Sequence, residues 1–294
     1  MKRRDFIKFS SATAASAAVM PSAISYLFQD KKTPLGLQLW SVRDAMGKDA
    51  MGTLKSLSKH GYSYVESFGL TDGKWFGLSP VEMKKALADL GMTQRSGHQM
   101  VTSEQYDTAK KDITDDVKKA FDAAATVGQK YVICPYMADG DRNKEKVKVL
   151  CEAYNKAGEY AKKVGLRFGY HNHDFEFTTR IDDMPMYQYL LDHTDPKLVC
   201  FEMDMCWVVR GKYNPIDWFK MYPGRFELAH MKDLASVDKS ESCIIGTGVV
   251  DFKQIIANAK VAGLKNFIVE LEHYKATSVE EVGVCYKNLR KMIA

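Results

Sequence analysis

Short apolar runs alternate with amphipathic segments along most of the chain. In five places a helical period ends in a glycine, and a run of apolar and β-branched residues begins one or two positions later. These glycines are Gly61, Gly91, Gly128, Gly165 and Gly263. A glycine at this position is typical of a helix C-cap, and the apolar run after it is typical of a buried strand. Repeated helix–strand units indicate parallel strands that are joined by crossover helices.

Eight apolar runs can be laid out as strands, with helical segments between them. They cover residues 35–39, 63–68, 93–98, 131–134, 166–171, 198–204, 226–230 and 267–271. Eight parallel strands in a stretch of this length match a closed barrel, which typically takes ~250 residues. The pattern therefore predicts an α/β fold, a (β/α)8 TIM barrel. A doubly wound open sheet is the main competitor, but no GxGxxG motif follows the first strand.

The first thirty residues have the pattern of an export signal. The chain opens with MKRRDFIK, and a mildly apolar run of small residues continues to about Ala23. The Arg3–Arg4 pair is similar to a twin-arginine signal, which a receptor reads and which anchors nothing. We expect 1–30 to be a signal peptide with a short linker and 31–294 to be the barrel domain, exported to the periplasm. A short basic amphipathic helix is the alternative for the N-terminal segment.

Charge and cysteine content narrow the function classes. The 42 basic and 37 acidic residues give a net charge of +5, and part of this excess lies in the first eight residues. There is no basic stripe with interleaved aromatic residues, so we expect no nucleic-acid partner. No later run approaches the ~20 apolar residues of a membrane span, so we expect no stable membrane anchor. The six cysteines are widely spaced without a CxxC, which favours buried thiols over disulfides.

Polar residues stand at or just beyond the carboxyl end of nearly every predicted strand. They are Gln38, Glu66, His98, Tyr136, His171, His173, Glu202, Asp204, His230, Lys232, Glu270 and Glu272. A closed barrel gathers these strand ends around one axis, where the active sites of TIM barrels lie. Buried carboxylates and imidazoles in one pocket need a cation among them. The residue types suit one divalent ion, Mn²⁺, Zn²⁺, Co²⁺ or Mg²⁺, and not a structural zinc site made of cysteines.

Five motifs together resemble the xylose-isomerase-like barrel superfamily, in its branch of sugar phosphate isomerases and epimerases. They are YHNHDFE at 170–176, FEMD at 201–204, LAHMKD at 228–233, GTG at 246–248 followed by Asp251-Phe252, and Val269-Glu270. The resemblance implies one divalent ion bound at the ends of strands five to eight. It assigns Asp204, His230 and Glu270 as ligands. His171 stands where the family has the glutamate of a Glu-Asn-His run, with His173 and Glu176 as alternatives for the fourth ligand.

The resemblance also implies a mechanism. In the family the metal holds neighbouring hydroxyl and carbonyl oxygens of a sugar and stabilises an enediolate, while flanking groups move a proton. Glu66, His98 and Lys232 are the candidate catalytic residues, and support of the ligands from behind is their alternative role. The candidate substrate-binding residues are Gln38, Trp40, Tyr136, His173 and Trp207. Packing at the barrel rim is the alternative role of the aromatic residues among them.

The expected partner is a small-molecule sugar. Because export takes the protein away from intracellular sugar phosphates, we predict an isomerase or epimerase that acts on a non-phosphorylated or keto sugar. One alternative is a lyase or hydratase that acts on 3-keto-glycosides by enolate-driven elimination. A second alternative is a non-catalytic sugar-binding barrel. The resemblance also leaves room for a homodimer.

Overall fold

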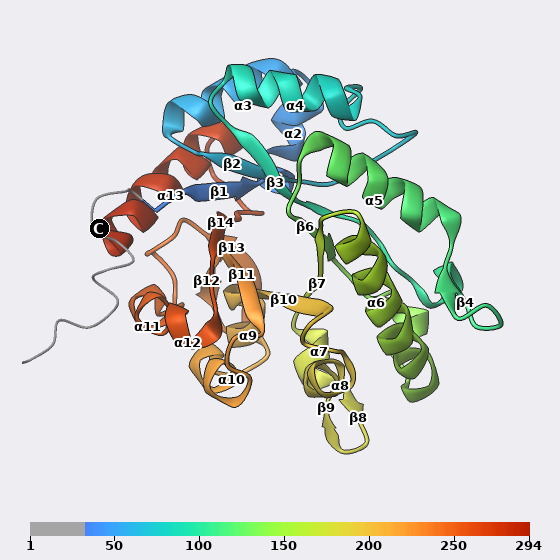
Figure 1. The fold of residues 1–294 in the computed structure, drawn as a ribbon. Coiled ribbons are helices and arrows are strands. Elements are labelled where there is room, and N and C mark those ends of the chain that lie inside the picture. Colours follow the sequence, from blue (N-terminus) through green and yellow to red (C-terminus); the bar gives the residue numbers. More distant parts are fainter. Residues whose placement is uncertain (1–32) are drawn as a thin grey trace, which may run out of the picture. The chain divides into compact units, whose positions relative to one another are not determined.

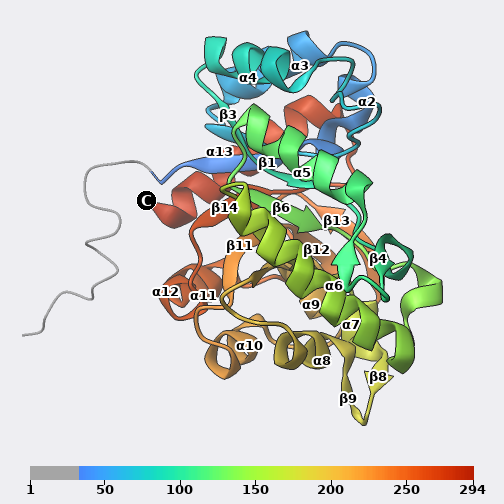
Figure 2. The same cartoon turned by 45° about the vertical axis from the view of Figure 1, so that its right-hand side comes forward.

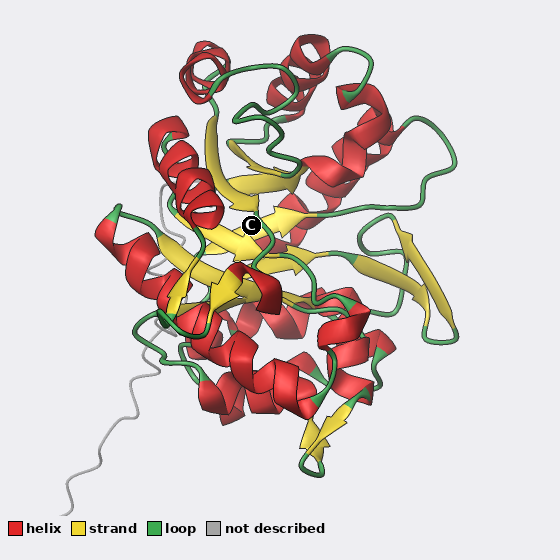
Figure 3. Cartoon of the chain, turned by 90° about the vertical axis from the view of Figure 1, so that its right-hand side faces the viewer, coloured by secondary structure: helices red, strands yellow, loops and turns green. Residues whose placement is uncertain are grey.

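The structure is a computed structural model that describes residues 33–294. Eight parallel strands close into a barrel with helices around it (Figures 1 and 3). The strands are β1 (Leu35–Gln38), β2 (Tyr64–Ser67), β3 (Thr93–His98), β6 (Tyr131–Cys134), β7 (Arg167–His171), β10 (Val199–Asp204), β11 (Phe226–Met231) and β14 (Asn266–Val269). They follow one another around the barrel in chain order, and β14 closes it against β1. The predicted TIM barrel is confirmed, and each predicted strand overlaps an observed one.

Each barrel strand is followed along the chain by at least one helix. They are α2 (Arg43–Met46), α3 (Ala50–His60), α4 (Pro80–Asp89), α5 (Asp115–Val127), α6 (Lys144–Lys163), α7 (Phe175–Thr178), α8 (Met186–His193), α9 (Met205–Arg210), α10 (Pro215–Met221), α11 (Phe252–Ala257), α12 (Ala259–Ala262) and α13 (Ser278–Ile293). Two glycines predicted as C-caps, Gly61 after α3 and Gly128 after α5, have φ of 103° and 97°. Only glycine adopts this backbone readily, which explains why the helices end there.

Three two-stranded hairpins interrupt the barrel pattern. They are β4 (Tyr106–Asp107) with β5 (Asp112–Ile113), β8 (Arg180–Ile181) with β9 (Met184–Pro185), and β12 (Asp233–Ser236) with β13 (Lys239–Cys243). Figure 2 shows β8 and β9 projecting away from the barrel. Each hairpin follows the carboxyl end of a barrel strand, so the hairpins belong to the face where the predicted site residues lie.

The GTG motif is a loop held by Asp233. The carboxylate of Asp233 accepts hydrogen bonds from the backbone N–H groups of Leu234, Gly246, Gly248 and Val250 at 2.8–3.1 Å. A Cβ atom on Gly248 would lie 2.3 Å from the carbonyl oxygen of Leu234, so this position requires glycine. The motif therefore shapes the loop after β13 and contributes no side chain to the site.

The barrel interior below the site is apolar. Tyr64, Ile133, Cys200, Leu228 and Ile268 pack there as a fully buried cluster. All six cysteines are free, and only Cys243 is partly exposed, so the prediction of unpaired thiols is confirmed. No helix among residues 33–294 is long and apolar enough to cross a membrane. The predicted signal peptide at 1–30 lies outside the described residues.

The register of the strands places the site residues at two depths along the barrel axis. His171 pairs with Glu202 across β7 and β10, and Asp204 pairs with His230 across β10 and β11. Glu270 directly follows β14. Since Glu202 and Asp204 are two residues apart on one strand, both side chains point to the same side of β10, with Asp204 nearer to its carboxyl end.

Candidate active site

A pocket of about 510 Å³ lies at the carboxyl ends of the barrel strands. Its lining consists of Trp40, Phe68, His98, Pro135, Tyr136, His171, His173, Trp207, Glu270 and Glu272. A second hollow of about 650 Å³, at the amino ends of several strands, has no histidine or carboxylate in its lining. The side chains that can act as acids or bases therefore lie at the carboxyl ends of the strands, as the sequence predicted.

Four side chains from the ends of β7, β10, β11 and β14 form what we call the outer group: His171, Asp204, His230 and Glu270. One ligand atom from each lies within 4.8 Å of the others. Nδ1 of His230 is 3.1 Å from Nε2 of His171 and 2.9 Å from Oε2 of Glu270. Oδ2 of Asp204 is 3.6 Å from Nε2 of His171. The structure brings together all four residues for which the sequence predicted metal binding.

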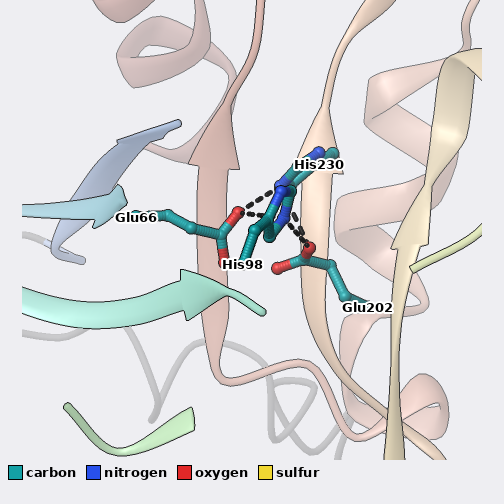
Figure 4. Close-up of side chains that lie close together, drawn as sticks. All are labelled: Glu66, His98, Glu202 and His230. Atoms are coloured by element: carbon teal, nitrogen blue, oxygen red, sulfur yellow. Dashed lines mark hydrogen bonds and ion pairs between the residues drawn. The ribbon is translucent and has the colours of Figure 1, made fainter. Parts of the chain in front are cut away.

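A second cluster, the inner group, consists of Glu66, His98, Glu202 and His230 (Figure 4). Nε2 of His230 lies 2.6 Å from Oε1 of Glu66 and 3.1 Å from Oε2 of Glu202. Nε2 of His98 lies 3.1 Å and 3.3 Å from the same two oxygens. His230 therefore belongs to both groups, one through each ring nitrogen.

The residues of the outer group fit a divalent cation. All four are buried, and Oδ2 of Asp204 has no hydrogen-bond partner. Leaving a buried carboxylate oxygen unpaired is costly unless a cation meets it. Two imidazoles and two carboxylates are a donor set that Zn²⁺, Mn²⁺ and Co²⁺ accept. His171 completes this set, whereas the other candidates for the fourth position do not reach it.

Both of those candidates have different partners. Glu176 accepts hydrogen bonds from the Tyr170 hydroxyl at 2.6 Å and from the backbone N–H of His173 at 2.8 Å. Burial raises the pKa of Glu176 to about 8, against these hydrogen bonds, which lower it. The His173 ring packs among Tyr136, Phe175 and Trp207 with centroid distances of 5.3–5.8 Å. Burial, together with the charges of neighbouring cationic groups, holds the pKa of His173 well below its usual value, so its ring is neutral.

The buried charges shift the protonation of the inner group. Burial alone would lower the pKa of His98, but the carboxylates of Glu66 and Glu202 raise it to about 9. Burial would likewise lower the pKa of His230, and Glu202, Glu270 and Glu66 together raise it well above its usual value. A carboxylate only accepts hydrogen bonds, so each imidazole nitrogen that faces one carries a proton or a cation.

Lys232 is a buried cation beside the outer group. Its Nζ atom lies 2.6 Å from Oε1 of Glu272, 3.4 Å from Oε2 of Glu270 and 3.6 Å from Oδ2 of Asp204. It also lies 4.5 Å from the ring centroid of Trp207, a cation–π contact. The three carboxylates raise the pKa of Lys232 against the effect of burial, so the ammonium form persists.

Some of the remaining predicted residues line the pocket, and others lie behind the lining residues and contact them. Trp40 and Tyr136 line the pocket with 43% and 38% of their surface exposed. Gln38 is fully buried behind the wall, where its amide donates to Oε1 of Glu66 at 2.8 Å. Glu66 is also fully buried and meets His98, which reaches the pocket. Gln38 and Glu66 therefore position other groups and do not line the pocket.

Two carboxylates stood out in the sequence without an assigned role. Glu202 joins the inner group, and Glu272 lines the pocket and contacts Lys232. Glu202 stands two residues before Asp204, and Glu272 stands two residues after Glu270. This spacing indicates that each glutamate points to the same side of its strand as the predicted ligand. Their contacts come from other strands, so spacing alone did not reveal what they do.

Comparison with known proteins agrees with the barrel fold. Residues 54–288 match the xylose isomerase-like TIM barrel family. An inosose dehydratase from Clostridium perfringens is 29% identical over an alignment of 129 residues, and the match covers 38% of this chain and 42% of that protein. The matched region thus spans less than half of the length of such curated relatives.

Two solved structures are similar over most of the chain. A sugar phosphate isomerase/epimerase from Parabacteroides distasonis is 30% identical, with a TM-score of 0.77 over 92% of this chain and 98% of that one. A structure of the IolI protein with a bound zinc atom is 16% identical, with a TM-score of 0.70 over 88% and 98%, and shows the shared fold. Since the family match covers well over half of the residues, the chain belongs to the xylose isomerase-like TIM barrel family.

Proposed function

We propose that this protein is a divalent-metal-dependent enzyme that moves a proton on a carbon next to the carbonyl of a non-phosphorylated or keto sugar, forming an isomer or epimer. The observation that carries the proposal is the unpartnered, fully buried oxygen of Asp204 among His171, His230 and Glu270. Two of these residues, His171 and Glu270, line the pocket, which also holds acid–base groups. An ion held by these four residues would polarise a carbonyl group as a Lewis acid.

Two groups on the pocket wall can exchange protons with a substrate. Glu272 presents a carboxylate whose Oε1 atom is held by Lys232, and His98 presents an imidazole whose Nε2 atom lies between two carboxylates. We assign Glu272 as the group that accepts the proton and His98 as the group that returns it. Lys232 stabilises the negative charge that develops on the substrate near Glu270 and Glu272. Glu66 then acts through His98 and does not contact the substrate.

The charges around the pocket favour a substrate without a phosphate. The lining contains two carboxylates, Glu270 and Glu272, and neither Lys nor Arg. Lys232, just behind the lining, already contacts three carboxylates. A phosphate dianion would meet the negative charge of these carboxylates without a lysine or arginine in the lining to bind it, whereas a neutral sugar can hydrogen-bond to these groups and stack on Trp40 or Tyr136.

A dehydratase or lyase is the second candidate. The similarity to inosose dehydratases favours it, because elimination from a keto sugar, a keto-inositol or a 3-keto-glycoside begins with the same proton abstraction. His98 would then protonate the departing oxygen and not a carbon. A sugar-binding barrel without catalysis is disfavoured, since it would need the aromatic lining but not the buried acid–base groups.

Proton exchange distinguishes these candidates. The metal-loaded protein is incubated in D₂O with free sugars, keto-inositols and 3-keto-glycosides, and each mixture is followed by NMR. Deuterium beside the carbonyl together with a new epimer or ketose supports the isomerase. Loss of water or release of an aglycone supports the lyase. Absence of exchange with every substrate contradicts both, and a chelator-treated sample shows whether exchange requires the metal.

We also propose export by the twin-arginine route, which rests on the Arg3–Arg4 pair and the mildly apolar run of small residues after it. Changing both residues to lysine should retain the full-length chain in the cytoplasm, whereas the natural chain should be recovered shortened in the periplasmic fraction. A natural chain that stays in the cytoplasm at full length would contradict the proposal.

A further inference from the structure

Two serine hydroxyls hold the backbone of the chain just after β14. The N–H of Leu271 donates to Oγ of Ser41 at 3.0 Å. The N–H groups of Glu272 and His273 both donate to Oγ of Ser242, at 2.8 and 3.0 Å. Backbone N–H groups need such acceptors where the ladder of a strand has ended. The hydroxyl of Ser242 therefore fixes the backbone of the residue to which the proposed function gives the proton, Glu272.

Ser242 is itself held in place by its neighbours. It is a buried residue of β13, and its backbone pairs with Leu234 of β12. Its backbone N–H donates to Nδ1 of His273 at 3.2 Å, and its hydroxyl lies 3.4 Å from the same atom. A hydroxyl has one hydrogen and two lone pairs, so that of Ser242 can accept two N–H groups and still donate to His273. The β12–β13 hairpin and the loop after β14 are therefore joined at a single serine.

The side chain of Glu272 reaches the pocket from this loop. It lines the pocket, and its Oε1 atom accepts a hydrogen bond from Nζ of Lys232 at 2.6 Å. Within residues 33–294, Lys232 is the only side chain that contacts this carboxylate, so its second oxygen is open to a substrate. A base must lie within hydrogen-bonding reach of the proton that it takes, and a displacement of about 1 Å can lower a rate by about 10²-fold. The position of the Glu272 backbone should therefore affect the rate of proton transfer.

We propose that Ser242 is a positioning residue for proton transfer, whose hydroxyl holds the backbone of Glu272 so that the carboxylate faces the reacting carbon of the substrate. This inference rests on the proposed function, which assigns Glu272 as the proton acceptor. Among the described residues, none of the β12–β13 hairpin lines the pocket. The hairpin therefore contributes to turnover through Glu272 and not by contact with the substrate.

Hydrogen exchange of backbone amides tests the contact without a substrate. The amides of Glu272 and His273 are followed by NMR in the natural protein, in Ser242→Ala and in Ser240→Ala. Ser240 is an exposed residue of the same strand and serves as the matched control. We expect the protection of both amides to fall by roughly 10-fold in Ser242→Ala, because each loses its acceptor, and to stay unchanged in Ser240→Ala. Equal protection in Ser242→Ala and the natural protein would overturn the inference.

Turnover links the contact to the reaction. The metal-loaded variants are assayed in D₂O with the same free sugars, keto-inositols and 3-keto-glycosides as the natural protein. We expect Ser242→Ala to lower kcat by roughly 10–100-fold and to leave KM within about 2-fold, because the hydroxyl does not touch the substrate. Ser242→Thr keeps the hydroxyl and should restore most of kcat, and Ser240→Ala should match the natural protein. Circular dichroism and metal analysis show that each variant is folded and loaded.

Glu272→Gln separates a failure of this inference from a failure of the proposed function. If Glu272→Gln abolishes exchange while Ser242→Ala keeps the natural kcat, the proposed function stands and the positioning role is wrong. If Glu272→Gln keeps full turnover, Glu272 is not the proton acceptor and its assignment fails. Absence of exchange by the natural protein with every probe contradicts the proposed function and, with it, any role of Ser242 in turnover. A Ser242→Ala protein that unfolds or loses its metal would show that Ser242 only maintains the structure.

Discussion

Oδ2 of Asp204 lies 3.6 Å from Nζ of Lys232, and both side chains are buried. The distance is too long for a hydrogen bond, and Lys232 is closer to Glu272 and Glu270. The lysine therefore shares one charge among three carboxylates and leaves Asp204 incompletely neutralised. The two residues therefore have different roles. Asp204 is available to a cation other than Lys232, and Lys232 controls the charge around Asp204.

Replacing Asp204 with asparagine should remove the metal ion that the outer group binds and, with it, the turnover of substrate. The amide keeps the size of the side chain but loses the charge that faces His171 and His230. Loss of a direct ligand should lower metal affinity by more than the ~10–100-fold typical of a group behind a ligand. Cys206→Ala, a buried change two residues along, is the control and should keep both properties. Metal analysis and the exchange assay measure them. Full activity in metal-free Asp204→Asn would refute the mechanism.

Replacing Lys232 with methionine should separate metal binding from turnover. Methionine has similar length and can pack on Trp207, but it removes the cation beside Asp204 and Glu270. Without this competing charge, affinity for a divalent ion should rise, while turnover should fall by about 10²–10⁴-fold because a charge that assists proton transfer is lost. Competition with a coloured chelator measures affinity. A variant that loses its metal as well would indicate that Lys232 only maintains the structure.

The barrel could be predicted because its strands leave a strong local signal. Buried parallel strands appear as apolar runs, and glycines such as Gly61 and Gly128 mark the helix ends before them. The hairpins could not be predicted in the same way. The β12–β13 hairpin and its loop depend on the Asp233 carboxylate, which contacts backbone groups up to 17 residues further along the chain.

The site could be predicted in part for a similar reason. Each predicted ligand stands at a strand end, and closure of the barrel brings these ends together whatever their separation in the chain. Contacts deeper in the barrel depend on register, which the sequence does not reveal. Gln38 pairs with Glu66 across β1 and β2, and therefore supports that residue behind the pocket wall. Glu202 meets His98 across 104 residues, and no local pattern indicates that contact.

Trp40 should contribute to substrate binding without affecting the chemical step. It is the most exposed of the large apolar residues that line the pocket, and its ring packs edge-on against Phe68, 5.0 Å between centroids. Removing a stacking surface worth about 0.5–1.5 kcal/mol should raise KM by roughly 2–10-fold and leave kcat unchanged. Trp40→Ala is compared with Trp40→Phe, which should restore most of the affinity. An equal fall in kcat would show that Trp40 positions the reacting groups instead.

Glu176 should make the protein less stable as the pH rises. Burial raises the pKa of this carboxyl from 4.5 to about 8, so the folded chain keeps a proton that the unfolded chain loses above about pH 4.5. Stability is therefore greatest below that pH and declines as pH rises toward 8, by at most about 1.4 kcal/mol per pH unit for one group. Other groups also titrate, so the informative quantity is the difference between the natural protein and Glu176→Gln. The glutamine cannot ionise but keeps a partner for Tyr170. Urea unfolding of metal-free samples between pH 5 and pH 8.5 should show the variant gaining relative stability as the pH increases. A constant difference across this range would mean that Glu176 is already ionised in the folded protein.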